Sequence, residues 1–197
     1  MYYVMDSAGT TWRGHEVLAQ LRKNRLLDYE THSAFSRCDP ILFCPRLEFE
    51  INPKRTRPDA YTRTAAIDVF SRRLVELLGA AGIRFETFEI ALVDRRGVSM
   101  GEGTHVAFHL LECDEAIDVD STTFSGWRNT GIDKLVLRND FLESGKLLTR
   151  DRKQTNLVIA HEKLKEKLHQ AGITGLTFKP VSEYRIRGLP LKGPSVE

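Results

Sequence analysis

Hydrophobic and polar residues alternate along several short stretches of the chain, a period that is typical of half-buried β-strands. Alternation over residues 47–51 and 88–93 predicts two such strands, and the apolar run at 106–111 is the expected hairpin partner of the second. Short apolar segments at 2–5 and 135–137 predict two further strands. The run at 106–111 also fits a helical stripe that continues to residue 117, so a helix is its alternative.

An internal repeat is the most informative feature of the pattern. Residues 71–88 align without a gap with residues 161–178, and eight of the eighteen pairs are identical. Each copy has the pattern of an amphipathic helix that ends at a glycine and is followed by a strand. Ser71 is a suitable N-cap for the first helix, whereas His161 is expected to cap the second poorly. Chance similarity between two short amphipathic helices is the alternative explanation.

These elements predict an α+β fold, with a mixed or antiparallel sheet and a few helices. Apolar runs precede both repeated helices, so we expect a duplicated strand–helix–strand element over residues 65–93 and 157–181. A further helix is predicted at 14–23. We expect one domain over residues 1–187 and a flexible tail at 188–197, where two prolines and two glycines fall within ten residues.

Composition narrows the classes of function. The chain has 197 residues, with 29 basic and 27 acidic side chains, so its formal net charge of +2 gives no reason to expect nucleic acid or a membrane as a partner. No stretch approaches the 18 apolar residues of a membrane span, and the N-terminus lacks the pattern of a secretory signal. The three cysteines, Cys38, Cys44 and Cys113, are expected to be reduced thiols. We therefore expect a soluble, cytoplasmic protein.

The motifs that could support catalysis or cofactor binding are weak. Gly97–Gly101 spells G-x-S-x-G around Ser99, but a strand-like run follows it where a nucleophile elbow needs a helix. His105 and His109 are four residues apart, about 13 Å on a strand, which is too far for two ligands of one zinc ion. We expect no catalytic residues, no metal and no cofactor.

Five carboxylates fall within residues 112–120, and their role has several interpretations. The spacing does not fit an EF-hand loop, and a catalytic pair would need two separated pKa values. An acidic surface that steers a basic protein partner and a solvated edge without function both remain open. Trp127 and Arg128 are residue types that anchor interfaces, although a tryptophan in the core is the alternative. The candidate partner-binding residues are Asp114, Glu115, Asp118, Asp120, Trp127 and Arg128.

Three segments carry a resemblance to a known family. Tyr2–Asp6, Ala116–Ser121 and the ending His161–Val181 together resemble the eleventh catalogued immunity-protein family of bacterial polymorphic-toxin systems, formerly a domain of unknown function. The resemblance covers about residues 1–182, with a loose match at 25–60, and His161 stands where the family usually has serine. It implies a cytosolic α+β protein that binds and blocks a toxin encoded beside it, without catalytic residues of its own.

The function expected from the sequence is therefore that of an immunity protein, which occludes the active site of a cognate toxin acting in the cytoplasm. Two rival hypotheses remain open. One is a small hydrolase that uses Ser99 or the acidic cluster, and the other is a regulatory binding module without a toxin. The sequence does not indicate the oligomeric state.

Overall fold

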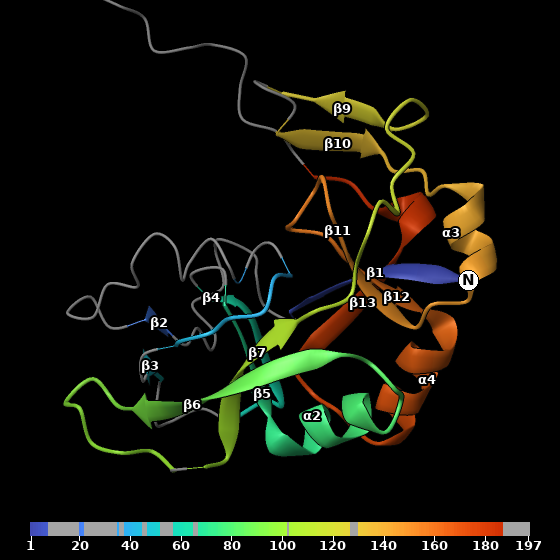
Figure 1. Ribbon diagram of the computed structural model, residues 1–197. Coiled ribbons are helices and arrows are strands. Elements are labelled where there is room, and N and C mark those ends of the chain that lie inside the picture. Colours follow the sequence, from blue (N-terminus) through green and yellow to red (C-terminus); the bar gives the residue numbers. More distant parts are fainter. Residues whose placement is uncertain are drawn as a thin grey trace, which may run out of the picture.

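The computed structural model describes residues 1–7, 20–21, 35, 38–44, 47–51, 57–64, 67–101, 103–126 and 130–186. Within these residues, a five-stranded sheet, a six-stranded sheet and a separate hairpin combine with three α-helices (Figure 1). This arrangement confirms the α+β fold with mixed and antiparallel sheets. The predicted tail at 188–197 lies outside the described residues.

The six-stranded sheet has the order β2-β3-β6-β7-β5-β4, and only the β3–β6 pair is parallel. Its strands are β2 (Gln20–Leu21), β3 (Leu47–Glu50), β4 (Ala60–Thr64), β5 (Ile67–Ser71), β6 (Phe85–Val93) and β7 (His105–Leu110). The strands expected from alternation are confirmed as β3 and β6. The hairpin partner is also a strand, β7, so the helical alternative for this run is wrong.

The five-stranded sheet has the order β13-β1-β12-β11-β8, and only the β11–β8 pair is parallel. Its strands are β1 (Tyr2–Ser7), β8 (Cys113–Asp114), β11 (Leu148–Asp151), β12 (Val158–His161) and β13 (Leu176–Pro180). A separate hairpin of β9 (Thr123–Ser125) and β10 (Gly131–Lys134) lies beyond this sheet, and the 3-10 turn η2 (Val181–Glu183) follows β13 (Figure 1).

The predicted duplication is present in three dimensions and is larger than the sequence indicated. The helices α2 (Arg72–Gly79) and α4 (Glu162–Gln170) each connect two strands that flank a central antiparallel strand. The first unit is β4-β5-α2-β6 with β7 at its centre, and the second is β11-β12-α4-β13 with β1 at its centre. The central strand follows the first unit along the chain but precedes the second, so the two units are related by a circular permutation.

The two repeated helices begin and end in the same way. The Ser71 Oγ accepts a hydrogen bond from the Leu74 N–H at 3.2 Å, and the His161 Nδ1 accepts one from the Lys163 N–H at 3.1 Å. The expectation that His161 caps poorly is therefore wrong, because a neutral imidazole offers an acceptor nitrogen at the place of the serine hydroxyl. Both helices are followed by a glycine in the left-handed region, with φ of 77° at Gly82 and 67° at Gly172.

The ungapped alignment of the repeats fails in the strands that follow the helices. The ladder registers place Leu176 of β13 where Phe85 lies in β6, one residue further along than the alignment predicts. Because side chains alternate between the faces of a strand, Phe88 packs into one core and Phe178 into another. The pairing of these two phenylalanines in the sequence is therefore not a structural equivalence.

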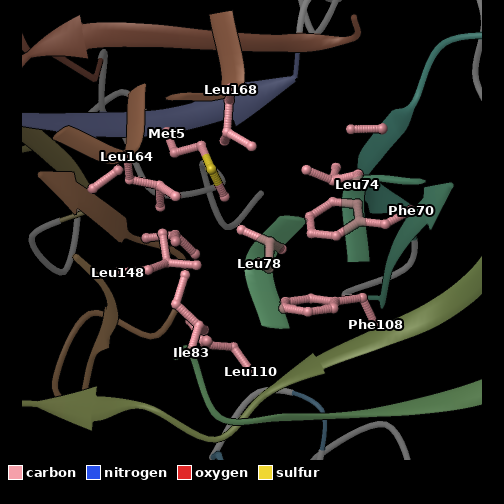
Figure 2. Close-up of a cluster of buried hydrophobic side chains, with 13 residues drawn as sticks. Met5, Phe70, Leu74, Leu78, Ile83, Phe108, Leu110, Leu148, Leu164 and Leu168 are labelled. Atoms are coloured by element: carbon pink, nitrogen blue, oxygen red, sulfur yellow. The ribbon is translucent and has the colours of Figure 1, made fainter. Parts of the chain in front are cut away.

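Both units bury their helices in one shared core. Leu74 and Leu78 of α2 lie in the same cluster as Leu164 and Leu168 of α4, together with Met5 of β1 (Figure 2). A second cluster covers the other face of the six-stranded sheet, and a third covers the other face of the five-stranded sheet. The two sheets thus enclose a central core with their helices, and each sheet carries an outer core as well.

Two predicted elements differ from the structure. Gln20 and Leu21 form strand β2, so the end of the helix predicted at 14–23 is wrong, and its other residues lie outside the described ones. Leu135 and Leu137 are buried as predicted, but the strand there is β10, which ends at Lys134. Leu137 forms only an isolated bridge with Ile117.

Candidate partner-binding surface

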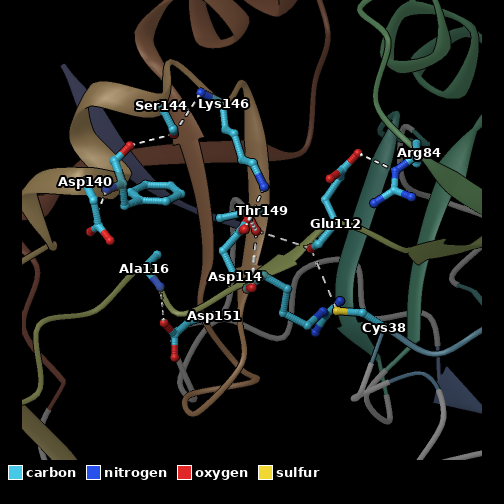
Figure 3. A network of polar contacts seen from close by, with 12 residues as sticks. Cys38, Arg84, Glu112, Asp114, Ala116, Asp140, Ser144, Lys146, Thr149 and Asp151 are labelled. Carbon is cyan, nitrogen blue, oxygen red and sulfur yellow. Dashed lines mark hydrogen bonds and ion pairs between the residues drawn. The ribbon is translucent and has the colours of Figure 1, made fainter.

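The acidic segment of the sequence is held in place by a buried aspartate that the sequence analysis did not single out. The Asp151 side chain lies at the end of β11, and the residue is 1% exposed. Its carboxylate accepts hydrogen bonds from the N–H group of Ala116 (Figure 3) and from that of Ile117, each at 3.0 Å. It also accepts the N–H groups of Lys153 at 2.9 Å and Gln154 at 2.6 Å. Asp151 thereby fixes the chain between Asp114 and Asp118.

Most carboxylates of the acidic segment have intramolecular partners. Asp114 accepts hydrogen bonds from the Lys146 Nζ at 2.6 Å and from the Thr149 Oγ1 at 2.8 Å (Figure 3). Glu115 lies 3.3 Å from the Lys153 Nζ. Basic side chains from the loops around β11 therefore interleave with the carboxylates, and the surface carries mixed charge instead of a uniform negative field.

Asp118 and Asp120, the other two predicted partner-binding carboxylates, lie on a turn that follows Asp114 and Glu115 in the chain. Asp118 accepts hydrogen bonds from the Ser121 Oγ at 2.7 Å and from the N–H groups of Ser121 and Asp120. These bonds, those of Ser121 first, lower the pKa of Asp118, and the charge of Arg138 acts in the same direction. Asp120 is exposed on the same turn. Trp127 and Arg128 lie outside the described residues, so their predicted role stays a prediction.

The short helix α3 (Asn139–Ser144) stands next to the acidic segment. Arg138, the N-cap residue, donates to both oxygens of Asp140 in the first turn, at 3.1 and 2.9 Å. Phe141 anchors the helix in the outer core, where its ring lies 5.0 Å from that of Tyr2. Gly145, with a φ of 65°, ends the helix in the left-handed conformation. The apolar residues Phe141 and Leu142 lie between polar residues, and a glycine follows them. This pattern is typical of a short helix and could have predicted α3 from the sequence.

A charged hollow lies on one face of α3. It has a volume of about 260 Å³. The residues around it are Asp114, Glu115, Arg138, Asp140, Phe141, Ser144 and Lys146. Two of the predicted partner-binding residues therefore line the hollow, together with basic residues that the sequence analysis did not connect to them.

A larger and mostly apolar groove lies on the opposite face of α3. It has a volume of about 580 Å³, and its apolar lining includes Met1, Tyr2, Leu135, Leu137, Leu142 and Val181. Asn139 and Leu142 face the groove, whereas Asp140 and Ser144 face the charged hollow, as expected for two sides of one helix. Leu142 is 45% exposed, although it is a large apolar residue. The helix therefore separates an apolar from a charged surface.

The histidines of β7 are structural groups. The His105 Nε2 lies 2.9 Å from the Pro58 carbonyl oxygen, and the His109 Nε2 lies 2.7 Å from that of Asp39. Burial lowers the pKa of both imidazoles, so both are neutral at pH 7. Within the described residues, no group of three or more histidine, cysteine or acidic side chains is arranged to hold a metal ion.

Ser99 lies in the loop that joins β6 to β7. Asp94 starts this loop, and its carboxylate accepts the N–H groups of Arg96 and Val98, each at 2.8 Å. Ser99 is exposed and forms an isolated antiparallel bridge with Val93. The predicted hairpin loop is therefore confirmed, and the serine is not on the strand–helix turn that activates it in hydrolases.

No model of a known protein family matches the chain, and no curated protein matches it. Among the described residues, no helix combines the length and the apolar character that crossing a bilayer requires.

Proposed function

We propose that this protein is an immunity protein, which binds a cognate bacterial toxin acting in the cytoplasm and occludes its active site. Helix α3 would form the centre of the interface. The observation that carries this proposal is the position of an apolar groove and a charged hollow on opposite faces of one short helix. Stable protein interfaces combine a largely apolar centre with a polar rim, and here both lie within a single patch.

The groove can supply binding energy. Leu142 and Met1 are 45% and 68% exposed. Full burial of an exposed apolar side chain contributes about 1.5–3 kcal/mol, so covering the exposed part of each contributes roughly half to two thirds of that. The groove volume of about 580 Å³ also leaves room for an aromatic or aliphatic side chain of the partner. A standard interface buries about 1,200–2,000 Å² in total, so the toxin would also cover surface beyond α3.

The charged hollow can supply specificity. Asp114 pairs with Lys146, and Arg138 pairs with Asp140, at distances of 2.6 and 2.9 Å. Surface ion pairs of this kind contribute little to folding, so a partner with matching charges can replace them at small cost. Charged rims mainly increase the rate of association and exclude wrong partners.

The three segments that resemble the immunity-protein family lie at or beside the same groove, which favours this surface as the interface. Tyr2 comes from the first segment, and His161 and Val181 from the last; all three line the groove. The middle segment lies beside it, because the Asp118 N–H donates to the carbonyl oxygen of Val136, another groove residue. Segments far apart in the sequence thus meet at the proposed interface.

The test is a rescue and binding experiment with the product of the neighbouring gene. We expect the wild-type protein to restore growth of cells that express this product and to bind it one-to-one in calorimetry. Leu142→Glu places a charge at the groove, so we expect at least a tenfold weaker complex and loss of rescue.

The matched control is Val98→Glu, which introduces the same charge at an apolar residue that is 58% exposed on the β6–β7 loop. This variant should bind and protect like the wild type, and both variants should melt at the wild-type temperature. Full protection by Leu142→Glu would place the interface elsewhere. Absence of any complex with the wild-type chain would contradict the immunity function itself.

A further inference from the structure

Two cysteines that are distant in sequence meet inside the protein. Cys38 lies in the described loop 38–44, and Cys113 lies in β8. The Cys38 Sγ is 3.8 Å from the carbonyl oxygen of Glu112, the residue that precedes Cys113 (Figure 3). After burial, which is the largest cause, contributions from Cys113 to the raised pKa of Cys38 agree with this proximity. No disulfide joins them in this structure, and neither lines the hollow or the groove on α3.

The backbone holds Cys38 in an unusual conformation. With a φ of 60°, Cys38 is the one non-glycine residue with positive φ in the described part of the chain. Neighbouring contacts fix the loop: the His109 ring bonds to the Asp39 carbonyl oxygen at 2.7 Å, and the Ile41 N–H donates to Glu86 at 2.9 Å. A left-handed conformation is unfavourable for cysteine, so these contacts keep the Cys38 side chain against β8.

The two thiols have different environments. Cys38 is buried, and this burial, followed by the hydrogen bond and charge of Cys113, raises the pKa of Cys38 to about 12. The guanidinium of Arg150, whose backbone pairs with Cys113 in the sheet, acts in the opposite direction. Cys113 is only half-buried, so it is the thiol that a small oxidant in solvent reaches first.

We propose that Cys113 and Cys38 form a redox-active pair that closes to a disulfide when the protein meets hydrogen peroxide. The Cys113 sulfur attacks one peroxide oxygen, the O–O bond breaks, and Cys113 becomes a sulfenic acid while one water molecule leaves. The Cys38 sulfur then attacks the Cys113 sulfur, the S–O bond breaks, and the Cys38 proton leaves with the hydroxyl as a second water. Two thiols are oxidised, and one peroxide is reduced to two waters.

The cross-link would connect two parts of the fold. The loop of Cys38 packs on the outer core of the six-stranded sheet through Ile41, whereas β8 is the edge strand of the five-stranded sheet. A disulfide between Cys38 and Cys113 would close the long loop of chain between these two residues, and this removes conformational freedom from the unfolded chain. We expect the melting temperature of the oxidised protein to rise by about 5 °C or more. This proposal does not depend on the proposed function.

The test uses the full chain, reduced, freed of reductant and then exposed to hydrogen peroxide at low protein concentration. After free thiols are capped with N-ethylmaleimide, we expect a monomer with one capped cysteine, Cys44, and a mass lower by two hydrogen atoms at the cross-link. Peptide mapping without reductant should join the peptides of Cys38 and Cys113. A cross-link to Cys44, a cross-link between chains, or oxygen addition without any cross-link would overturn the proposal.

Variants identify the role of each thiol. Cys44→Ser is the matched control and should form the same disulfide at the wild-type rate. Cys38→Ala should trap Cys113 as a sulfenic acid that dimedone labels, whereas Cys113→Ala should leave Cys38 unlabelled. Labelling of Cys38 in the Cys113→Ala variant, at the rate seen for Cys113, would contradict the order of the two steps. The peptide map of the wild-type chain decides the pairing even if a variant fails to fold.

Discussion

The two units of the duplication share a backbone arrangement but differ in what surrounds it. In the first unit, the residue that pairs with the helix N-cap is His105, which bonds to the Pro58 carbonyl oxygen and packs against Tyr61. In the second unit, Tyr2 occupies this place and lines the apolar groove beside α3. The same position is thus buried in both units, at 5% and 6% exposed, but it borders a surface groove only in the second. The difference shows that the repeat supplies the scaffold, whereas the residues attached to the second unit supply the candidate interface.

One carboxylate makes polar contacts with both units. Asp59 accepts hydrogen bonds from the Ser71 Oγ at 2.8 Å and the Arg73 guanidinium at 2.9 Å in the first unit. It also accepts the Thr174 N–H at 2.9 Å in the second. Burial alone would raise the pKa of Asp59, but these donors, Arg73 first, lower it to about 2. The contact keeps the start of α2 against the end of α4, so the repeats form one body with a common core.

The largest expected effect tests whether the two helices contribute equally to that core. Leu78 and Leu168 are equivalent residues, each 1% exposed in the same cluster. Leu78→Ala and Leu168→Ala should each lower the free energy of unfolding by about 2–5 kcal/mol, because each removes packed methyl groups and leaves a cavity. Urea denaturation should give values within about 1 kcal/mol of each other.

Leu142→Ala is the matched control for both variants, since the same side chain is removed where it is 45% exposed. Its effect should remain within about 0.5 kcal/mol. A much smaller loss for Leu168→Ala than for Leu78→Ala would mean that the second unit packs less tightly than the structure indicates.

The next prediction concerns how stability changes with pH, which depends on two buried histidines that the central strand β7 has and the central strand β1 lacks. Burial lowers the pKa of His105 and His109 in β7, whereas β1 has Tyr2 and Asp6 at these places. Below about pH 6.5 the unfolded chain binds protons that the folded chain does not, so stability falls as the pH falls. The limiting slope is about 1.4 kcal/mol per pH unit for each such histidine.

Urea denaturation at several pH values between 7 and 5 measures this slope. The double variant His105→Gln and His109→Gln should have a flatter dependence on pH, even though it is less stable at pH 7. His169→Gln, which changes an exposed histidine of α4, should keep the wild-type slope. An unchanged slope in the double variant would assign the acid sensitivity to other groups.

The same comparison shows what could be predicted from the sequence. The period-two pattern gave β3 and β6 correctly, because the hydrophobic effect sorts alternate residues to the two faces of a sheet. The helical repeat was also visible, since its apolar positions and its closing glycine depend on local geometry alone. The equivalence of Phe88 and Phe178 was wrong because the second unit has one additional residue before its strand, and a chance identity of two residues hid the shift.

The candidate surface was only partly predictable for a different reason. The acidic segment was apparent, but its basic partners come from later parts of the chain: Lys146 follows Asp114 by 32 residues. The role of Asp151 could not be predicted from the sequence either, because its carboxylate bonds to backbone groups more than 30 residues earlier. The parallel pairing of β8 with β11 creates these contacts, and no pattern of neighbouring residues in the sequence predicts that two such distant strands pair.

The smallest expected effect tests the two helix caps. Ser71→Ala removes the hydroxyl that caps α2 and should lower stability by about 1 kcal/mol. His161→Ala removes the imidazole cap of α4, and we expect a comparable loss of about 1 kcal/mol, because the cap bond of 3.1 Å is as short as the Ser71 bond of 3.2 Å. His161→Asn is the control, since its side-chain oxygen can accept the same N–H.

The pH dependence of stability distinguishes an imidazole cap from an asparagine cap. Burial, followed by the charges of the N-terminal ammonium and Lys163, lowers the pKa of His161, so the ring is neutral at pH 7 and Nδ1 accepts. Protonation converts Nδ1 into a donor that faces the Lys163 N–H, and the cap is lost. His161→Asn should therefore gain stability relative to the wild type as the pH falls from 7 to 4, whereas Ser71→Ala should show a constant difference. If the gap between His161→Asn and the wild type does not change with pH, the imidazole contributes by packing on Tyr2, 4.8 Å away, and not by capping α4.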